Sequence, residues 1–412
     1  MDRSKDLGAA LRAAVDAAFE REQVPWVQNL VDQPSHTYAK DDVEAAACRL
    51  DAAATELGLA VQRIADPGAR FADHRIYSTP AAAGDRRALV LVGHIDTVFP
   101  RSIGFLKFSR EPVDGDVIRG PGVLDMKSGL SVIIYALRAI REVNASLFES
   151  LPLRFVCVSD EEVGSPSSGA LILDALAHKT SAVMVFEAGR TEDKIVTRRK
   201  GGGAFTVTAR GRAAHAGNDH KSGRNAIHAL SLLIPKIEAI TRYERGITVN
   251  VGLIEGGSAK NTVPDHATCS IDTRFETVAD ADAVAQALHA LADDPFAGIE
   301  SVPEKLREVT IEVSGGISRP PMEATPEIQR LREFYERHAA AVGLQVGEAP
   351  LQGGGSDANL WAARGVPCID GLGPAGRFYH RVEEWSSLDS LRRRTQALAL
   401  FLAFENPESV HQ

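Results

Sequence analysis

Ala88-Leu-Val-Leu-Val-Gly93, followed at once by His94-Ile-Asp96, is the stretch of this sequence that decides the fold. An unbroken apolar run of this length predicts a β-strand buried on both faces, which requires a sheet covered by helices. Two further runs of the same kind occupy 153–158 and 182–186. Helical patterns separate these strands, among them one over 128–143. The alternation favours an α/β fold with a mainly parallel sheet and helices on both faces.

The pattern changes after the glycine run at 200–203. The predicted order becomes strand, helix, strand, strand, helix and strand, over 204–209, 225–243, 247–255, 266–274, 280–292 and 310–314. This β-α-β-β-α-β order is the split arrangement of a small ferredoxin-like α+β domain. Residues 314–321 resemble a linker that returns to the first domain. The sequence therefore predicts a larger domain over 1–199 and 316–412, with a smaller domain over 200–315 inserted into it.

The composition is that of an ordinary globular protein. Of the 412 residues, 44% are hydrophobic and 25% are charged, and the formal net charge is −9. A negative chain has no general attraction to nucleic acid or to anionic membranes. No apolar run approaches the roughly 18 residues of a membrane-spanning helix, and the first 23 residues lack the apolar core of a signal peptide. We therefore expect a cytoplasmic protein without nucleic-acid or membrane partners.

Histidines and carboxylates follow the predicted strands, where the ligand sites of open α/β sheets collect. They are His94, Asp96, Asp125, Asp160, Glu161, Glu162, Glu187 and His380. Taken singly, each has an ordinary interpretation as a polar turn, a helix cap or a solvated acidic loop. Together, two histidines and several carboxylates suit zinc, manganese or cobalt. The four cysteines lie far apart, which argues against a disulfide framework and against a cysteine-based zinc site.

Six motifs occur in order along nearly the whole chain. They are Gly93-His-Ile-Asp-Thr-Val98, Gly120-Pro-Gly-Val-Leu-Asp-Met-Lys127, Ser159-Asp-Glu-Glu-Val-Gly-Ser165, Gly211-Arg-Ala-Ala-His-Ala-Gly217, Gly353-Gly-Gly-Ser-Asp357, and Asp370-Gly-Leu-Gly-Pro374 with His380. In these motifs the sequence resembles the M20 family of co-catalytic zinc peptidases and deacylases, and specifically its carboxypeptidase G2-like (glutamate carboxypeptidase) branch. The resemblance implies a di-metal catalytic domain, with the inserted domain serving as a lid and dimerisation domain.

The same resemblance implies two divalent metal ions per chain, with zinc as the first expectation and manganese or cobalt as alternatives. The implied ligands are His94, Asp125, Glu162, Glu187 and His380. His94 and Glu187 would bind one ion, Glu162 and His380 the other, and Asp125 would bridge both. This division also explains the acidic run, because two divalent cations compensate carboxylates that would otherwise repel one another.

The family also implies how the reaction is assisted. Asp96 would support His94, and Glu161 would be the general base toward a hydroxide that bridges the two metals and attacks the amide. His215, in the inserted domain, would donate a hydrogen bond to the developing oxyanion, commonly across a dimer interface. The substrate carboxylate would be held by Asn261, Arg274, Gly354 and Gly355. Arg274 suits this role because a guanidinium binds a carboxylate through two hydrogen bonds.

The leading hypothesis is therefore hydrolysis of an amide next to a free carboxylate, in an N-acyl amino acid or at a C-terminal glutamate. Arg377-Phe-Tyr379 stands where relatives tend to have small residues, which motivates an alternative: an amidase or aminohydrolase for a small aromatic compound. A retired homologue acting as a binding protein is a second alternative, although every implied ligand and Glu161 are present. A serine hydrolase using Ser356 lacks the Gly-x-Ser-x-Gly elbow. The inserted domain should form a homodimer through its free sheet edge.

Overall fold

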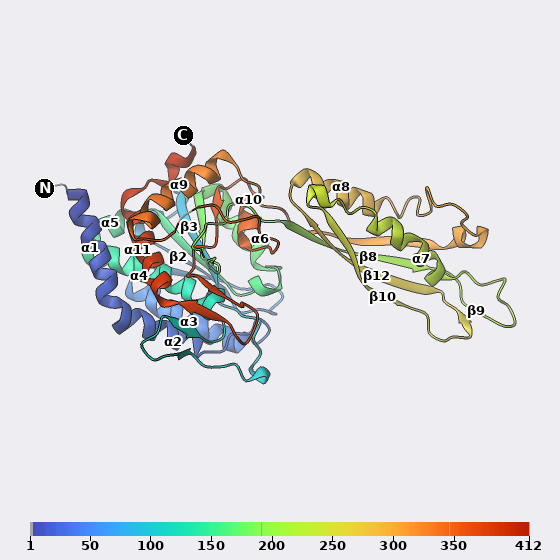
Figure 1. Ribbon diagram of the computed structural model, residues 1–412, viewed down its shortest axis with the longest axis horizontal. Helices are drawn as coiled ribbons and strands as arrows, with labels where there is room; N and C mark the ends of the chain where they lie inside the picture. Colours follow the sequence, from blue (N-terminus) through green and yellow to red (C-terminus); the bar gives the residue numbers. More distant parts are fainter. Residues whose placement is uncertain (1–2, 191, 346, 412) are drawn as a thin grey trace. The chain divides into compact units, whose positions relative to one another are not determined.

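A computed structural model of the chain describes residues 3–190, 192–345 and 347–411. These residues divide into two compact units, coloured along the sequence in Figure 1. The first unit takes the described residues of 1–198, 324–351 and 356–412, and the second takes 199–323 with 352–355.

The first unit is built on a central sheet of six strands in the order β1-β2-β6-β3-β7-β14. These strands are β1 (Ala60–Ile64), β2 (His74–Ser78), β3 (Ala88–His94), β6 (Leu153–Val158), β7 (Thr180–Val185) and β14 (Cys368–Ile369). The four strands β6, β3, β7 and β14 are parallel, whereas β1 and β2 are antiparallel to their neighbours. The mainly parallel α/β architecture predicted from the sequence is confirmed.

Helices cover both faces of this sheet. They are α1 (Arg3–Ala18), α2 (Val24–Val31), α3 (Lys40–Glu56), α4 (Ser128–Val143), α5 (Ala145–Ser150), α6 (Ser168–Leu176), α9 (Pro326–Ala341), α10 (Asp357–Ala362) and α11 (Leu388–Phe404). Strand β3 shows the two faces. Gly93 lies against Leu130 of α4, whereas Val92 on the opposite face lines a small internal cavity with Ile172 of α6 and Trp361 of α10. This alternation follows from the two-residue period of a strand.

The first unit also contains a second, small sheet. Its strands, in the order β15-β16-β5-β4, are β4 (Ser109–Arg110), β5 (Val117–Arg119), β15 (Gly376–Arg377) and β16 (Trp385–Ser387). Strand β16 runs antiparallel to β5, with Trp385 opposite Arg119. Because β5 and β16 pair, the segments that follow Arg119 and precede Trp385 leave the same end of this sheet together.

The second unit is an antiparallel sheet in the order β10-β12-β8-β13, with two helices on one face. Its elements are β8 (Gly201–Arg210), β9 (Ala214–His215), α7 (Ala226–Glu238), β10 (Thr248–Gly256), β11 (Thr262–Val263), β12 (His266–Phe275), α8 (Val278–His289) and β13 (Thr310–Arg319). The predicted ferredoxin-like order of strands and helices is confirmed. Its core combines alternate residues of the strands with the apolar faces of α7 and α8, for example Val207, Leu230 and Val284.

The predicted linker over 314–321 is wrong, because residues up to Arg319 belong to β13 and pair with β8. One of the two glycines that suggested a linker has a different cause. Gly315 has a positive φ of 95°, and a Cβ there would overlap the carbonyl oxygen of Ala204 on β8. Glycine is therefore required by a close approach inside the sheet. At the far end of β13, Arg319 pairs with Gly202, so both ends of the inserted segment lie side by side.

No helix among the described residues has both the length and the apolar character needed to cross a membrane.

Candidate active site

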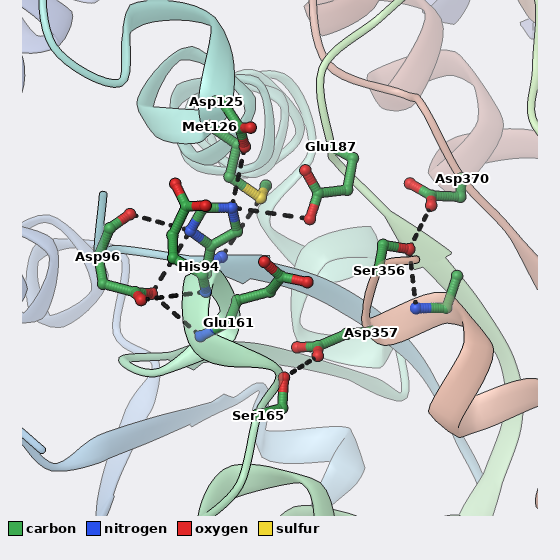
Figure 2. Close-up of polar contacts among 12 residues, drawn as sticks. His94, Asp96, Asp125, Met126, Glu161, Ser165, Glu187, Ser356, Asp357 and Asp370 are labelled. Atoms are coloured by element: carbon green, nitrogen blue, oxygen red, sulfur yellow. Dashed lines mark hydrogen bonds and ion pairs between the residues drawn. The ribbon is translucent and has the colours of Figure 1, made fainter. Parts of the chain in front are cut away.

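The candidate site lies at the carboxyl ends of three neighbouring parallel strands (Figure 2). His94 is the last residue of β3, Glu161 and Glu162 follow β6, and Glu187 follows β7. Because β3 lies between β6 and β7, side chains that follow these strands meet above the end of β3. Asp125 approaches from the irregular turn that precedes α4, where the Asp125–Met126 peptide bond is cis.

One group of ligands is buried at the end of β3. His94 Nε2 lies 3.1 Å from Asp125 Oδ1 and 3.6 Å from Glu187 Oε1. All three residues are buried, and one nitrogen or oxygen atom from each lies within 4.8 Å of the others. Glycine at position 93 allows Met126, the residue after Asp125, to pack against the end of β3. A Cβ on Gly93 would come within 2.5 Å of the Met126 side chain.

A second group adjoins the first through Asp125. His380 Nε2 lies 3.2 Å from Asp125 Oδ2 and 3.0 Å from Glu162 Oε2. Asp125 thus directs one carboxylate oxygen to each group. His380 differs from the other ligands because 48% of its side chain is exposed and its backbone has a positive φ of 65°. The structure therefore brings all five implied ligands together in two groups that share one residue.

Asp96 connects the first group to the acidic loop (Figure 2). Its carboxylate accepts hydrogen bonds from the backbone N–H groups of Glu161 and Glu162, both at 3.3 Å, and from the Thr37 hydroxyl at 2.8 Å. His94 Nδ1 lies 3.0 Å from the carbonyl oxygen of Asp96 and 3.5 Å from its carboxylate. These acceptors favour a proton on Nδ1, which leaves Nε2 free to bind a cation.

The pKa shifts of the site residues show that its buried carboxylates need positive charge to balance them. Burial and the nearby charge of Asp125 raise the pKa of Glu162 to about 8, and burial raises the pKa of Glu187. Burial alone would lower the pKa of His94, but the carboxylates of Glu187 and Asp125 hold it well above its usual value. Glu162 Oε1 is buried and has no hydrogen-bond partner among the described residues. Two divalent cations fit this donor set, since they satisfy the free oxygen and neutralise the carboxylates.

Glu161 adjoins the ligands without belonging to either group. It is half-buried, in the one-turn helix Glu161–Val163, and Figure 2 shows its side chain beside His94. A carboxylate that is near the ligands but not among them is free to exchange a proton with a molecule bound there.

The remaining predicted residues belong to the second unit. His215 is exposed on β9, and its Nδ1 accepts hydrogen bonds from the N–H groups of Gly217 and Asn218, both at 3.1 Å. Because Nδ1 is an acceptor here, Nε2 carries a ring proton and can act as a donor. Asn261 belongs to the same ribbon, since its carbonyl oxygen accepts from Ala216 N at 2.9 Å.

Arg274 lies at the other end of the second unit from His215. It is next to the last residue of β12, whereas His215 pairs with Thr262, which precedes the start of β12. Ten strand residues separate these ends by roughly 30 Å. The Arg274 guanidinium is half-exposed and donates to Asp272 Oδ1 at 3.0 Å. The loop with Gly354 and Gly355 is exposed, and Arg199 donates to the carbonyl oxygen of Gly354 at 2.9 Å.

The comparison with known families agrees with this arrangement. Residues 90–403 match the family model described as peptidase family M20/M25/M40. The chain belongs to this family. It is 28% identical over 373 residues to carboxypeptidase G2 of Pseudomonas sp. (strain RS-16), which covers 90% of this chain and 86% of that protein. As a member of the M20 family, the chain is a metal-dependent peptide hydrolase.

Solved structures of M20 peptidases share the fold. Aminopeptidase PepT from Bacillus cereus superposes with a TM-score of 0.73 at 22% identity, over 95% of this chain and 98% of that one. The YXEP protein from Bacillus subtilis, described as a dinuclear metal-binding peptidase of the M20 family, superposes with a TM-score of 0.68 at 15% identity. That alignment covers 94% of this chain and 98% of the YXEP chain.

Sequence reasoning assigned no role to two residues of this M20 site. Thr37 binds Asp96, and the fully buried Glu384 accepts hydrogen bonds from the backbone of Leu124 and Asp125. Thr37 carries no signal, because it lies in a polar segment far from every motif. Glu384 follows His380 closely, but nothing in the sequence separates it from its exposed neighbour Glu383.

Proposed function

We propose that this M20 peptidase hydrolyses an amide bond next to a free carboxylate, in an N-acyl amino acid or a C-terminal glutamate-type substrate. The observation that carries the proposal is the pair of ligand groups joined by Asp125, with Glu161 beside them. Imidazole and carboxylate donors suit Zn²⁺, and also Mn²⁺ or Co²⁺. When bound, the two cations would lower the pKa of water and polarise the substrate carbonyl.

The residues of the chain then have separate roles. His94, Asp125, Glu187, Glu162 and His380 hold the cations. Asp96 orients His94 and fixes the backbone of the acidic loop, and this backbone in turn positions the Glu161 side chain. Glu161 removes a proton from the attacking water and delivers it to the leaving nitrogen. Protonating that nitrogen lets the C–N bond break.

The substrate carboxylate is assigned to Arg274, Asn261 and the backbone at Gly354 and Gly355. An arginine can bind both oxygens of a carboxylate. His215 is assigned to the oxyanion, because its Nδ1 already accepts two backbone hydrogen bonds and Nε2–H remains as a donor. His215 and Arg274 lie at opposite ends of β12, so the His215 that meets a substrate held by Arg274 belongs to a second copy of the chain.

A homodimer would supply that second copy. Strand β10 is an edge strand of the second unit, with exposed Leu253 and Ile254. An apolar free edge favours pairing with the same strand of another chain about a two-fold axis. A monomer in light scattering at working concentration would contradict the dimer and the assignment of His215 together.

A second candidate acts at the same site. Phe378 and Tyr379 immediately precede His380 and are 44% and 47% exposed. The Tyr379 ring meets the His380 ring edge-on, with ring centroids 5.3 Å apart. Exposed aromatic side chains beside a ligand favour an amidase or aminohydrolase for a small aromatic compound, since they offer a surface on which a ring can stack.

The deciding experiment measures amine release by protein loaded with Zn²⁺ or Mn²⁺. The panel holds N-acyl amino acids, glutamate amides and aryl amides without a carboxylate. We expect release from carboxylate substrates that chelation abolishes, with Glu161→Gln slower by about 10²- to 10⁴-fold and still loaded with metal. Arg274→Ala should raise KM for these substrates, whereas Arg210→Ala, an exposed ion-paired arginine of the same sheet, should not. Preference for carboxylate-free aryl amides would select the second candidate.

A further inference from the structure

Glu384 is a buried carboxylate with no assigned role. Its side chain is fully enclosed, and its Oε1 accepts hydrogen bonds from Leu124 N at 2.7 Å and Asp125 N at 3.1 Å. Asp125 is the residue shared by both ligand groups. These two backbone donors satisfy Oε1 of this buried carboxylate, as burial of a polar group requires.

The turn around Asp125 needs an external acceptor. Asp125 and Met126 have non-helical backbone angles, so the turn that leads into α4 does not continue the regular helical hydrogen bonding. Glu384 supplies the acceptor for two consecutive N–H groups of this turn. A single oxygen therefore fixes the two peptide groups that flank the Leu124 Cα, and with them the backbone from which the Asp125 side chain projects.

Glu384 also belongs to the segment that carries His380. It directly precedes β16, where Trp385 pairs with Arg119 at the end of β5. The Arg119 side chain donates to the Glu383 carbonyl at 2.9 Å, and Glu384 N donates to the Arg381 carbonyl at 3.0 Å. The strand pair ends at this point. Beyond the strand pair, the hydrogen bonds of the Glu384 side chain link the segment before β16 to the segment after β5, as far as Asp125.

The loop that presents His380 requires such an anchor. Phe378 and His380 both have positive φ values, 67° and 65°, which are unfavourable for side chains other than glycine. Residues 377–383 are exposed. A strained, exposed loop keeps a defined geometry only when buried contacts at its ends determine it, and Glu384 is the buried residue at its C-terminal end.

We propose that Glu384 is a positioning residue that sets the spacing between Asp125 and His380, and so completes the second cation site. The inference rests on the proposed two-metal function. The first group needs Glu384 less, because His94 and Glu187 follow strands of the central sheet. The role depends on an acceptor oxygen at the correct reach from the backbone, and the negative charge of the carboxylate is secondary.

Three variants separate reach from charge. Glu384→Gln keeps the reach and an acceptor oxygen, and its amide nitrogen can replace Oε2, which has no hydrogen-bond partner among the described residues. Glu384→Asp keeps the charge but is one methylene too short. Glu383→Ala is the matched control, since this neighbouring carboxylate is exposed and its side chain binds Arg381. Thermal unfolding of each metal-free variant checks that it folds.

The measurement is titration of Mn²⁺ and Zn²⁺ into metal-free protein by calorimetry, with the electron paramagnetic resonance signal of the Mn²⁺ pair as a second readout. We expect wild type, Glu384→Gln and Glu383→Ala to bind two equivalents and to give the signal of coupled ions. Glu384→Asp should bind the first equivalent normally and the second about 10- to 100-fold more weakly, with the coupled signal lost. Its kcat should fall more than its KM rises.

Three outcomes would overturn the proposal. The first is binding of both equivalents at wild-type affinity by Glu384→Asp. The second is loss of the second equivalent in Glu384→Gln as complete as in Glu384→Asp. The third is the same loss in Glu383→Ala. The second outcome would show that the charge acts instead, for example on the buried ammonium of Lys127. Should Glu384→Asp not fold, a folded Glu384→Gln that binds one cation would overturn the proposal by itself. Wild type that binds fewer than two cations would overturn the proposed function as well.

Discussion

The two ligand groups use the same chemistry but are supported in different ways. His94, Asp125 and Glu187 are buried; His94 ends β3 of the central sheet, and Glu187 lies two residues beyond β7. The second group adds Glu162 and the half-exposed His380, which a strained surface loop presents. The sheet fixes the first group, whereas hydrogen bonds between loops fix the second. This difference predicts a tightly held first cation and a second cation that is more sensitive to conditions and nearer to solvent.

The largest effect should come from Asp125→Ala, because this substitution removes a ligand from both groups at once. We expect neither cation to be retained through dialysis. Activity should fall by far more than the roughly 10- to 100-fold that follows substitution of a residue hydrogen-bonded to a metal ligand. Metal analysis of the purified variant provides the measurement. If the variant retained one cation at full affinity, Asp125 would not join the two groups.

His94→Ala and His380→Ala test the contrast directly. His94→Ala leaves buried carboxylates without a partner, and we expect the metal-free protein to lose about 3–5 kcal/mol of unfolding free energy. His380→Ala should cost less than His94→Ala, because half of the His380 side chain is exposed and solvent weakens its ion pairs. Denaturant unfolding of both metal-free variants gives the two values. Equal losses would remove the distinction between a buried and an exposed group.

The second group should also respond to pH. Hydrogen bonds with Asp125 and Glu162 raise the pKa of His380 to about 11, so metal-free protein holds a proton there at neutral pH. A cation must displace it, and affinity should therefore fall by about tenfold per pH unit for each proton released as the pH is lowered. The folded-state pKa exceeds the unfolded one, so this proton stabilises metal-free protein fully below about pH 6.5 and is lost toward pH 11. Calorimetry at several pH values measures the slope, and a flat profile would contradict this account.

The smallest effect tests how the sheet supports the first group. A Cβ on Gly129 of α4 would overlap the carbonyl oxygen of Phe186, the residue before Glu187. Gly129→Ala should therefore cost about 1–3 kcal/mol of unfolding free energy and weaken the first cation. Gly8→Ala is the matched helical control, because a Cβ there meets only side-chain atoms, at 3.5 Å or more. If both variants were equally stable, the contact between α4 and the end of β7 would not support the site.

Much of the fold followed from local pattern. Helix α4 begins and ends at the residues predicted, because its apolar positions are continuous. The antiparallel β1–β2 hairpin was not predicted, since β1 is mostly exposed and β2 contains His74 and Arg75. Similarly, Ser314-Gly-Gly316 indicated a linker, although these residues pair with β8 and Gly315 is required by its close approach to Ala204.

The ligands were accessible from sequence because each follows a recognisable strand or motif. The supporting residues were not accessible, because their roles depend on contacts between segments far apart in the chain. Thr37 lies 59 positions from Asp96, and Glu384 lies 259 positions from Asp125. No local pattern distinguishes such residues from ordinary polar side chains. They become identifiable only when buried donors and acceptors are matched in three dimensions.

The pairing of Gly202 with Arg319 has a consequence for how this architecture can arise and be engineered. The ferredoxin-like unit leaves and re-enters the host chain at two adjacent strands, so its ends are already close together. An insertion of this kind adds little loop-closure entropy to the host. The unit can therefore be exchanged as a cassette for another of its kind, provided that the new cassette also places its first and last strands side by side.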